Sequence, residues 1–343
     1  MARKPRIEDL CERLGLSKAT VSKALNGYAS VREETRVRVL ECARELGYTQ
    51  SAGGEVNARL VRVGITAAIM MDDPGRITPF QLLLNNLIDG LTQRHFDTIM
   101  LPPSLLQEQS IPYEQAMRKQ NLDCAFLTGL RTDDPYYSQL LVTDFPTVLW
   151  DMSVPNPHVH NVFSNSIEGM RMVAEHLIAL GHRRIGMISG HRWAQVSQQR
   201  LNGYILALAE AGIPYDPSLV YEGDFSETAG AIGLQALLPK KVTAILCVCD
   251  VTALGVIRAA SAKGIRIPDD LSVVGYDNIN LADYIGPGLT SVEQHLDQVG
   301  RIIVTTICDI MHNRPVGDSF VQPSLVVRGS TAAPTASGET GIN

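Results

Sequence analysis

The feature that most limits the fold of this chain is a regular alternation of short apolar runs with helical segments from residue 61 onward. The apolar runs are typical of parallel strands buried on both faces of a sheet. These runs are 61–70, 97–102, 124–129, 147–151, 184–190, 244–250 and 272–278. The helical segments between them are 81–94, 167–180, 199–211, 228–237, 251–263 and 296–313. The alternation predicts an α/β fold of doubly wound parallel sheets, and its length favours two lobes over one.

Several chemistries are not supported by the motifs in this part of the chain. No GxGxxG or GxxxxGK[ST] motif follows any of the expected strands, which argues against a nucleotide-dependent enzyme. The six cysteines form no CxxC pair and no zinc spacing with the eight histidines, so we expect no metal site and no cofactor. Cys247 and Cys249 lie two residues apart, and a vicinal redox switch is the alternative to buried, reduced thiols.

Residues 6–27 have a different pattern, that of two short amphipathic helices joined by a glycine turn. The apolar residues Ile7, Leu10, Cys11 and Leu14 have helical spacing, and Gly15 ends the first helix. Ser17 is expected to cap a second helix from Lys18 to about Asn26. Its inward residues would be Val21, Ala24 and Leu25, and its outward residues would be Lys18, Ala19, Thr20, Ser22 and Lys23. Such a face suits the major groove of DNA, and the alternative is an ordinary helical hairpin.

The surrounding residues favour DNA binding over an ordinary hairpin. The strings KATVSKALNG (18–27) and VREETRVRVLECARELGY (31–48) resemble the N-terminal domain of the lactose-repressor (LacI/GalR) family of bacterial transcription regulators. The resemblance implies that Lys18, Ala19 and Lys23 read bases, and that Thr20, Ser22 and Asn26, near the cap residue Ser17, grip phosphates. It also implies a third helix, 33–46, which would brace the second through Val37, Leu40 and Ala43.

Further landmarks extend the resemblance over about residues 6–331. The segments 175–190, 199–204, 250–255, 264–278, 289–292 and 325–331 are similar to the effector domain of the same family, which itself resembles periplasmic sugar-binding proteins. The implied organisation is a helix-turn-helix head (1–48), a linker (49–60), a two-lobed effector domain (61–331) and a tail (332–343). The first lobe would hold 61–162 with 293–320, and the second would hold 163–290 with 321–331. A ligand would bind between them, at the carboxyl ends of the strands.

Polar residues at the strand ends are suited to a polyhydroxylated ligand. Asp151, Asp250 and Asp277 each follow an apolar run, and Arg200 opens the helix after the run 184–190. Carboxylates accept hydrogen bonds from sugar hydroxyls, and a guanidinium donates to sugar oxygens. Aspartate also favours turns and helix N-caps, so Asp250 has a purely structural alternative. By resemblance, Arg200 and Asp277 match the most regular effector contacts of the family.

Three aromatic residues complete the expected site. Trp193 lies in a polar loop before Arg200, and Trp150 precedes Asp151 in a strand. An indole can stack on a sugar or a base, although it more often packs in a core. Phe80 follows Thr78 and Pro79, where the family has its NPF signature, and helix-cap packing is its alternative role.

The linker departs from the family pattern. The segment TQSAGGEVNARLVR (49–62) is several residues shorter than the usual PNxxARxL linker, which forms a hinge helix on DNA. It contains Gly53 and Gly54, and each glycine disfavours a helix by about 1 kcal/mol relative to alanine. We therefore expect looser coupling between effector and DNA than in members with an intact hinge helix.

Charge and hydropathy fit a small head on an acidic body. Residues 1–60 carry 11 Lys and Arg against 8 Asp and Glu, and the whole chain has a net charge of −6. With a net charge of only +3, one head is expected to bind DNA specifically only together with a second head. We therefore expect a homodimer. The leucine-rich segment 80–91 is a candidate interface. No signal peptide or apolar run of membrane-spanning length is recognised, so a cytoplasmic location without membrane contact is expected.

The sequence thus predicts a dimeric, ligand-responsive repressor of carbohydrate-related genes that binds double-stranded operator DNA and a small molecule, most simply a sugar. It is not expected to be an enzyme, although the spacing of Asp151, Asp250 and Asp277 leaves carboxylate catalysis formally open. Two further alternatives stand: a cytosolic binding module that does not read an operator, and a regulator that responds to a purine or nucleoside.

Overall fold

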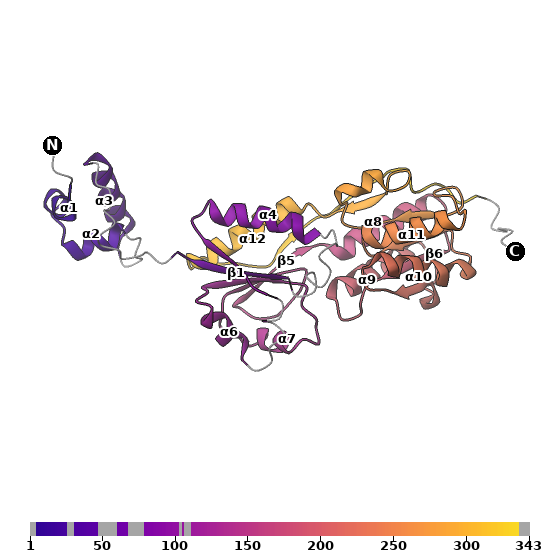
Figure 1. Cartoon of the computed structure of the whole chain (residues 1–343), viewed down its shortest axis with the longest axis horizontal. Coiled ribbons are helices and arrows are strands. Elements are labelled where there is room, and N and C mark those ends of the chain that lie inside the picture. The colour runs from indigo at the N-terminus through magenta and orange to yellow at the C-terminus, as the bar shows by residue number, and fades with distance from the viewer. Residues whose placement is uncertain are drawn as a thin grey trace. The chain divides into compact units, whose positions relative to one another are not determined.

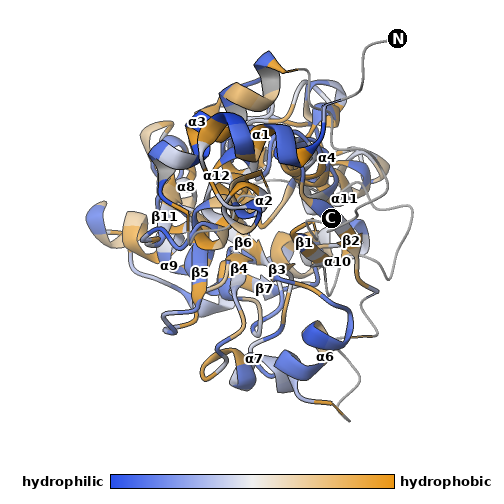
Figure 2. Ribbon diagram, turned by 90° about the vertical axis from the view of Figure 1, so that its left-hand side faces the viewer, coloured by the Kyte–Doolittle hydropathy of each residue, from blue (hydrophilic) through white to orange (hydrophobic). Residues whose placement is uncertain are grey.

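The computed structural model describes residues 5–25, 31–46, 60–67, 79–102, 105 and 111–335. It divides into two compact units, Met1–Leu60 and Val61–Asn343. The small unit holds three helices in its described part: α1 (Ile7–Leu14), α2 (Lys18–Leu25) and α3 (Glu33–Glu45). Figure 1 shows these helices as the indigo part of the chain, and Figure 2 shows that α1 and α3 carry both hydrophilic and hydrophobic stretches.

The core of the small unit confirms most of the expected packing but corrects one helix face. Val21 and Ala24 are buried as predicted. In α3, however, Val37 is 43% exposed, and the buried residues are Val39, Cys42 and Ala43. These positions have helical spacing with Leu46, which packs against them. Ala43 is therefore buried as predicted and Val37 is not, and the side chain of Leu40 lies outside the described residues.

The large unit contains a first lobe built on a six-stranded parallel sheet with the order β11-β5-β4-β3-β1-β2. The strands are β1 (Arg62–Ala67), β2 (Asp97–Met100), β3 (Cys124–Thr128), β4 (Thr147–Trp150), β5 (Val159–Ser164) and β11 (Ser319–Val321). One face packs on α4 (Pro79–Thr92) and α12 (Leu296–Met311), and the other on α6 (Tyr113–Lys119) and α7 (Pro135–Leu140), as Figure 1 shows. Neighbouring strand residues serve opposite faces: Phe126 belongs to the first core and Leu127 to the second.

The second lobe has a four-stranded parallel sheet with the order β7-β6-β8-β9. Its strands are β6 (Ile185–Ser189), β7 (Val220–Glu222), β8 (Ala244–Cys247) and β9 (Ser272–Val274). Helices α8 (Ser166–Ala179) and α9 (Gln195–Glu210) cover one face, and α10 (Glu227–Leu237) and α11 (Asp250–Ala262) cover the other. Strand β8 ends at Cys247, so Cys249 is not on that strand as expected but caps α11. Both thiols are buried and free.

The chain passes between the two lobes three times. The first passage follows β5, and the second follows β10 (Ser291–Glu293), after which α12 packs on the first sheet. The third joins β11 to β12 (Ser324–Val326), which pairs antiparallel with β10. Each lobe is therefore assembled from separated stretches of sequence. No helix within the described residues is long and apolar enough to cross a membrane.

Candidate functional site

The turn between α1 and α2 is fixed by two residues that the sequence pointed to. Gly15 adopts a left-handed conformation with φ 64°, which glycine tolerates without a Cβ clash, and ends α1. The Ser17 hydroxyl accepts a hydrogen bond from the backbone N–H of Thr20 at 3.1 Å, so Ser17 caps α2 as predicted. This cap fixes where α2 begins and hence which of its residues face outward.

The outer face of α2 carries the expected polar residues. Lys18, Ala19 and Lys23 are exposed, and Thr20 and Ser22 are half-buried. Lys18 forms an exposed ion pair with Glu8 at 2.7 Å, which lowers the pKa of that carboxyl through the hydrogen bond. An exposed pair of this kind is weak, so Lys18 can exchange Glu8 for another partner. Asn26 lies outside the described residues.

Between the lobes, the predicted effector residue Arg200 lies at the centre of a buried polar group. Helix α9 begins at Gln195, so Arg200 lies in its second turn and does not open it. Its guanidinium carbon is 3.7 Å from the centre of the Tyr276 ring, a cation–π contact. One guanidinium N–H donates to the carbonyl oxygen of Val248. These contacts hold the guanidinium with its side chain only 5% exposed.

Asp277 and Gln294 complete the ion-pair side of this group. The Asp277 carboxylate lies 3.7 Å from a terminal nitrogen of Arg200 and accepts a hydrogen bond from the Gln294 amide at 2.5 Å. Asp277 has a left-handed φ of 105°, a conformation that is costly for a residue with a side chain. Gln294 lies between β10 and α12, in the second passage between the lobes. The ion pair is thus tied directly to a segment that connects the lobes.

Asp151 reaches the same group from the first lobe. It directly follows β4, has φ 55°, and accepts a hydrogen bond from the backbone N–H of Ser164 at 2.9 Å. The structure therefore brings together the three residues Asp151, Arg200 and Asp277, which are separated in sequence. We call Asp151, Arg200, Asp277 and Gln294 the interlobe cluster.

Burial dominates the electrostatics of this cluster. Desolvation raises the pKa of Asp151 to about 7, against which the Ser164 hydrogen bond and the positive charge of Arg200 act. Desolvation also raises the pKa of Asp277, to about 6, and the charge of Arg200 and the Gln294 hydrogen bond oppose the rise. The positive charge of one guanidinium thus acts on two carboxyl groups. The cluster therefore contains one more acidic group than basic groups.

Asp250 differs from the other predicted acids. Its side chain is fully buried, and its two oxygens accept hydrogen bonds from the Ser291 hydroxyl at 2.6 Å and the Ile279 backbone N–H at 2.8 Å. Gly275 makes room for it, since a Cβ there would lie 2.0 Å from Asp250 Oδ1. Burial raises the pKa of Asp250 well above its ordinary value. These contacts join α11 to β10 and to the loop after β9. They give Asp250 a structural role, but not the expected one of a helix cap, because Cys249 is the N-cap of α11.

The aromatic residues divide between core and loop. Trp150 is 4% exposed and packs in the core of the first lobe. Trp193 stacks on His191 with ring centres 4.5 Å apart, and the Arg131 guanidinium lies 4.6 Å from its ring centre. Phe80 lies in the first turn of α4, and its side chain is outside the described part of the structure.

Contacts across the lobes surround the interlobe cluster. The Trp193 carbonyl accepts hydrogen bonds from the backbone N–H and the hydroxyl of Thr132, at 3.3 and 3.1 Å. The Gln195 side chain accepts from the Ser153 N–H at 2.8 Å and donates to the Ser153 carbonyl at 3.2 Å. Thr132 and Ser153 follow strands of the first sheet, whereas Trp193 and Gln195 follow β6. The described structure is therefore closed at this edge.

Several buried polar atoms at this edge have no hydrogen-bond partner among the described residues. They are Oγ1 of Thr66, Nε1 of Trp150, Oγ of Ser164 and Ser197, Nε of Arg200 and Oε1 of Gln294. Burying such atoms without partners is costly, and orphaned donors and acceptors that gather at strand ends are typical of a ligand site. Sequence reasoning missed Gln294 and Tyr276, because nothing in their local pattern marks them as facing Arg200.

Phe225 was also missed. It follows β7 with φ 65°, and a Cβ on Gly190 would lie 2.3 Å from its ring. Its ring centre is 6.3 Å from that of His191. His191, Trp193 and Phe225 therefore form a row of aromatic rings near Ser197, and we call this row the aromatic wall.

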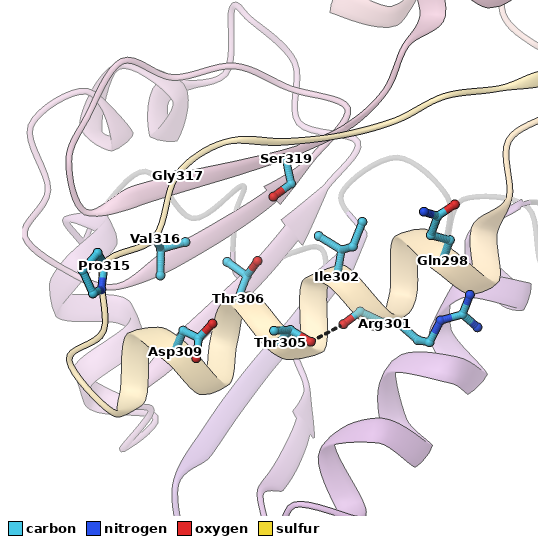
Figure 3. Close-up of a pocket in the computed structure, with 10 residues that line it drawn as sticks. All are labelled: Gln298, Arg301, Ile302, Thr305, Thr306, Asp309, Pro315, Val316, Gly317 and Ser319. Carbon is cyan, nitrogen blue, oxygen red and sulfur yellow. Dashed lines mark hydrogen bonds between the residues drawn. The ribbon is translucent and has the colours of Figure 1, made fainter.

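A surface hollow on the first lobe has different properties from the interlobe cluster. It has a volume of about 360 Å³ and lies between α12 and the segment 315–319, as Figure 3 shows. Its charged residues are already paired, Arg301 with Asp297 at 2.9 Å and Asp309 with Arg314 at 3.1 Å. None of the orphaned buried atoms of the described chain belongs to it. The interlobe cluster is therefore the better candidate for a ligand site.

Comparison with known families identifies two matching regions. Residues 6–51 match the family described as "Bacterial regulatory proteins, lacI family", and residues 174–331 match the "Periplasmic binding protein-like domain". The chain is 30% identical over 332 residues to the HTH-type transcriptional repressor CytR of Escherichia coli (strain K12), covering 95% of this chain and 96% of that protein. It is 29% identical over 333 residues to the repressor PurR of Aliivibrio salmonicida (strain LFI1238), covering 94% and 98%.

Solved structures show the same architecture. The complex of the transcriptional regulator CelR with cellobiose superposes with a TM-score of 0.72 at 28% identity, covering 95% of this chain and all of that one. The lac repressor dimer bound to operator and the anti-inducer ONPF gives a TM-score of 0.69 at 25% identity, covering 96% and 100%. The helix-turn-helix head, the two parallel sheets and their connections are therefore those of this group of regulators.

Proposed function

This chain belongs to the lacI family of bacterial regulatory proteins, and from that premise we propose that it is a cytoplasmic, sugar-responsive repressor that binds its operator as a homodimer. The observation that carries the sugar assignment is the interlobe cluster. Asp151, Arg200 and Asp277 converge there, with orphaned donors and acceptors beside them. Charge-assisted bonds from such a set orient hydroxyl groups well.

The charge of the cluster narrows the ligand class. Two acids and one guanidinium leave no surplus positive charge, because Arg200 is already balanced by Asp277, so a phosphorylated ligand would bury its charge without a cation to pair with it. An uncharged polyol has no such penalty, and the related regulator CelR is known in complex with cellobiose. A nucleoside is the alternative, favoured by the aromatic wall of His191, Trp193 and Phe225, on which a base would stack.

Ligand binding is expected to stabilise the closed arrangement of the two lobes and so to shift the balance between two states of the dimer. A ligand shifts such a balance only by its differential affinity for the two states. The linker 49–60 that would transmit the change, including Gly53 and Gly54, lies outside the described residues except for Leu60. The expected loose coupling therefore remains a prediction from sequence.

The test is calorimetry of the full-length protein with cellobiose, glucose and adenosine, followed by operator binding with and without any compound that binds. We expect a sugar to bind without being turned over and to change operator affinity. Arg200→Ala should weaken the binding of that sugar by about 1.5–3 kcal/mol, because a charge-assisted hydrogen bond is lost. Operator binding should be unchanged. Circular dichroism should accompany the calorimetry to check that the variant is folded, since Arg200 is only 4% exposed.

Leu206→Asp, a substitution on the exposed side of the same helix, is the matched control and should leave sugar affinity unchanged. Equal sugar binding by wild type and a folded Arg200→Ala protein would exclude the interlobe cluster as the effector site. Binding of adenosine alone would favour the nucleoside alternative.

A further inference from the structure

Asp151 is a half-buried acid that has no ion-pair partner of its own among the described residues. The Arg200 guanidinium is already committed to Asp277, the Val248 carbonyl and the face of Tyr276. Within the described residues, no basic nitrogen lies within ion-pair distance of the Asp151 carboxylate, and its one described side-chain hydrogen bond comes from the Ser164 backbone to Oδ1. The side chain stays partly accessible, which leaves its other oxygen available to a ligand.

The groups around Asp151 do not compensate for a negative charge there. From α9 it faces Arg200, and from the loop after β9 it faces Asp277, with the Tyr276 phenol between the lobes. Asp277 in turn is acted on by Glu293 and lies near the Cys249 thiol. With Asp151 and Asp277 both ionised, the closed site would bury one uncompensated negative charge, which is costly in a medium of low polarity.

We propose that Asp151 enters the effector complex as the protonated acid, so that an uncharged ligand binds in a charge-neutral site and its affinity falls as the pH rises. In this state Arg200 and Asp277 balance one another, and the Asp151 hydroxyl donates a hydrogen bond to a ligand oxygen. Desolvation raises the pKa of Asp151 to about 7, which favours the protonated form of this carboxyl toward neutral pH. The proposal rests on the sugar-binding function inferred above.

The direction of the pH dependence follows from linkage. A ligand that covers the accessible oxygen of Asp151 removes water and further disfavours the carboxylate, so binding above neutral pH takes up a proton. One proton taken up lowers the association constant by up to about tenfold per pH unit. The raised pKa of Asp151 also affects folding. The unfolded chain releases the Asp151 proton near the ordinary pKa of 3.8, whereas the folded protein holds it up to about pH 7. The free energy of unfolding should therefore fall as the pH rises from about 4 to about 7.

The experiment compares wild type with Asp151→Asn, which keeps the shape and removes the charge. With cellobiose or glucose as the probe, wild-type affinity should fall by up to about tenfold per unit between pH 7 and 8.5, while the variant should bind almost equally at both values. Calorimetry in two buffers of different ionisation enthalpy should show proton uptake by wild type only. Asp144→Asn, at an exposed aspartate of the same lobe, should retain the wild-type slope.

The free protein gives a second readout that needs no ligand. The thermal midpoint of wild type should fall between pH 4 and 7 relative to that of Asp151→Asn, and the Asp144→Asn protein should follow wild type. A flat wild-type affinity, an unchanged slope in Asp151→Asn, or loss of binding by that variant at every pH would each overturn the proposal. If no sugar binds, the sugar assignment fails separately, and the stability comparison still decides whether Asp151 holds a proton.

Discussion

At the scale of single residues, the surface of α2 gives the most direct test of DNA reading. Lys23 is exposed on the same helix as Lys18 and Ala19, and it lies outside the core of the small unit. We expect Lys23→Ala to weaken binding to the cognate operator by about 1–3 kcal/mol and to relax the preference at one base position. Gel-shift or anisotropy titrations with base-substituted operators would measure both effects.

Lys119→Ala removes the same charge from an exposed position of α6 and should leave operator affinity within error. Identical base preferences in wild type and Lys23→Ala would show that this lysine contacts at most the phosphates. Weakening that is uniform across all operator variants would point to the same conclusion.

The sequence predicted which residues would meet between the lobes better than it predicted their partners. Asp151 and Asp277 could be found because parallel strands present their carboxyl ends at one edge of a sheet, and Arg200 could be found through the family resemblance. Gln294 could not be found in this way, because it lies in the segment that connects β10 to α12. The position of this segment depends on how α12 packs on the first lobe. The bonds of Asp250 to Ser291 and Ile279 were equally hidden, since they depend on the path of the loop after β9.

At the scale of secondary-structure elements, strands within long apolar runs were predicted well, and strands interrupted by polar residues were missed. The runs at β3, β4 and β8 are buried along their whole length, so their composition alone indicates strands. The six-residue strand β5 was missed, as were strands β7, β10, β11 and β12, which have three residues each. Polar residues interrupt the apolar pattern of all five strands. The leucines of segment 80–91 also have a local explanation, because Leu83, Leu87 and Leu91 are buried in the first lobe's own core.

The pairing of α10 with α11 depends on a close backbone approach at Gly255. A Cβ at this position would lie 1.9 Å from the carbonyl oxygen of Glu227, a backbone atom that cannot rotate aside. We expect Gly255→Ala to force the helices apart and to lower the free energy of unfolding by about 1–3 kcal/mol, as overpacking does. Urea unfolding followed by circular dichroism would measure it.

Gly317→Ala provides the matched control, because no heavy atom lies within 4 Å of the added carbon. Its effect should stay within about 0.5 kcal/mol. Equal stability of the two variants would mean that α10 and α11 separate without cost.

At the scale of the whole molecule, an apolar surface on the second lobe is the stronger candidate for the proposed dimer contact. Tyr284 is 82% exposed and Leu281 is 37% exposed beside a hollow of about 520 Å³, which Leu254 and Ile257 also line. A patch of this kind is seldom left uncovered on a monomer. A twofold contact would place the same patch of both copies face to face.

We therefore expect Tyr284→Asp to shift the protein toward monomer in sedimentation at micromolar concentration and to weaken operator binding with it. The reason is that association would bury an unpaired carboxylate at the contact, which costs free energy. Ile232→Asp, at an exposed apolar position on α10, is the control and should remain associated. A wild-type protein that sediments as a monomer would refute the dimer, and a dimeric Tyr284→Asp protein would place the contact elsewhere.

The discontinuous first lobe also affects the order in which the chain can mature as it leaves the ribosome. The inner face of α4 is covered by α12, and β5 is completed by β11, yet both partners lie beyond residue 295. The core that Leu83 and Leu87 share with α12 can therefore be completed only after residues 296–311 have been made, whereas residues 163–290 already contain every strand of the second sheet. Most of the second lobe can thus form before the core of the first lobe is complete, in contrast to the usual N-terminal-first order. During that interval the nascent first half is the segment that most needs protection from aggregation.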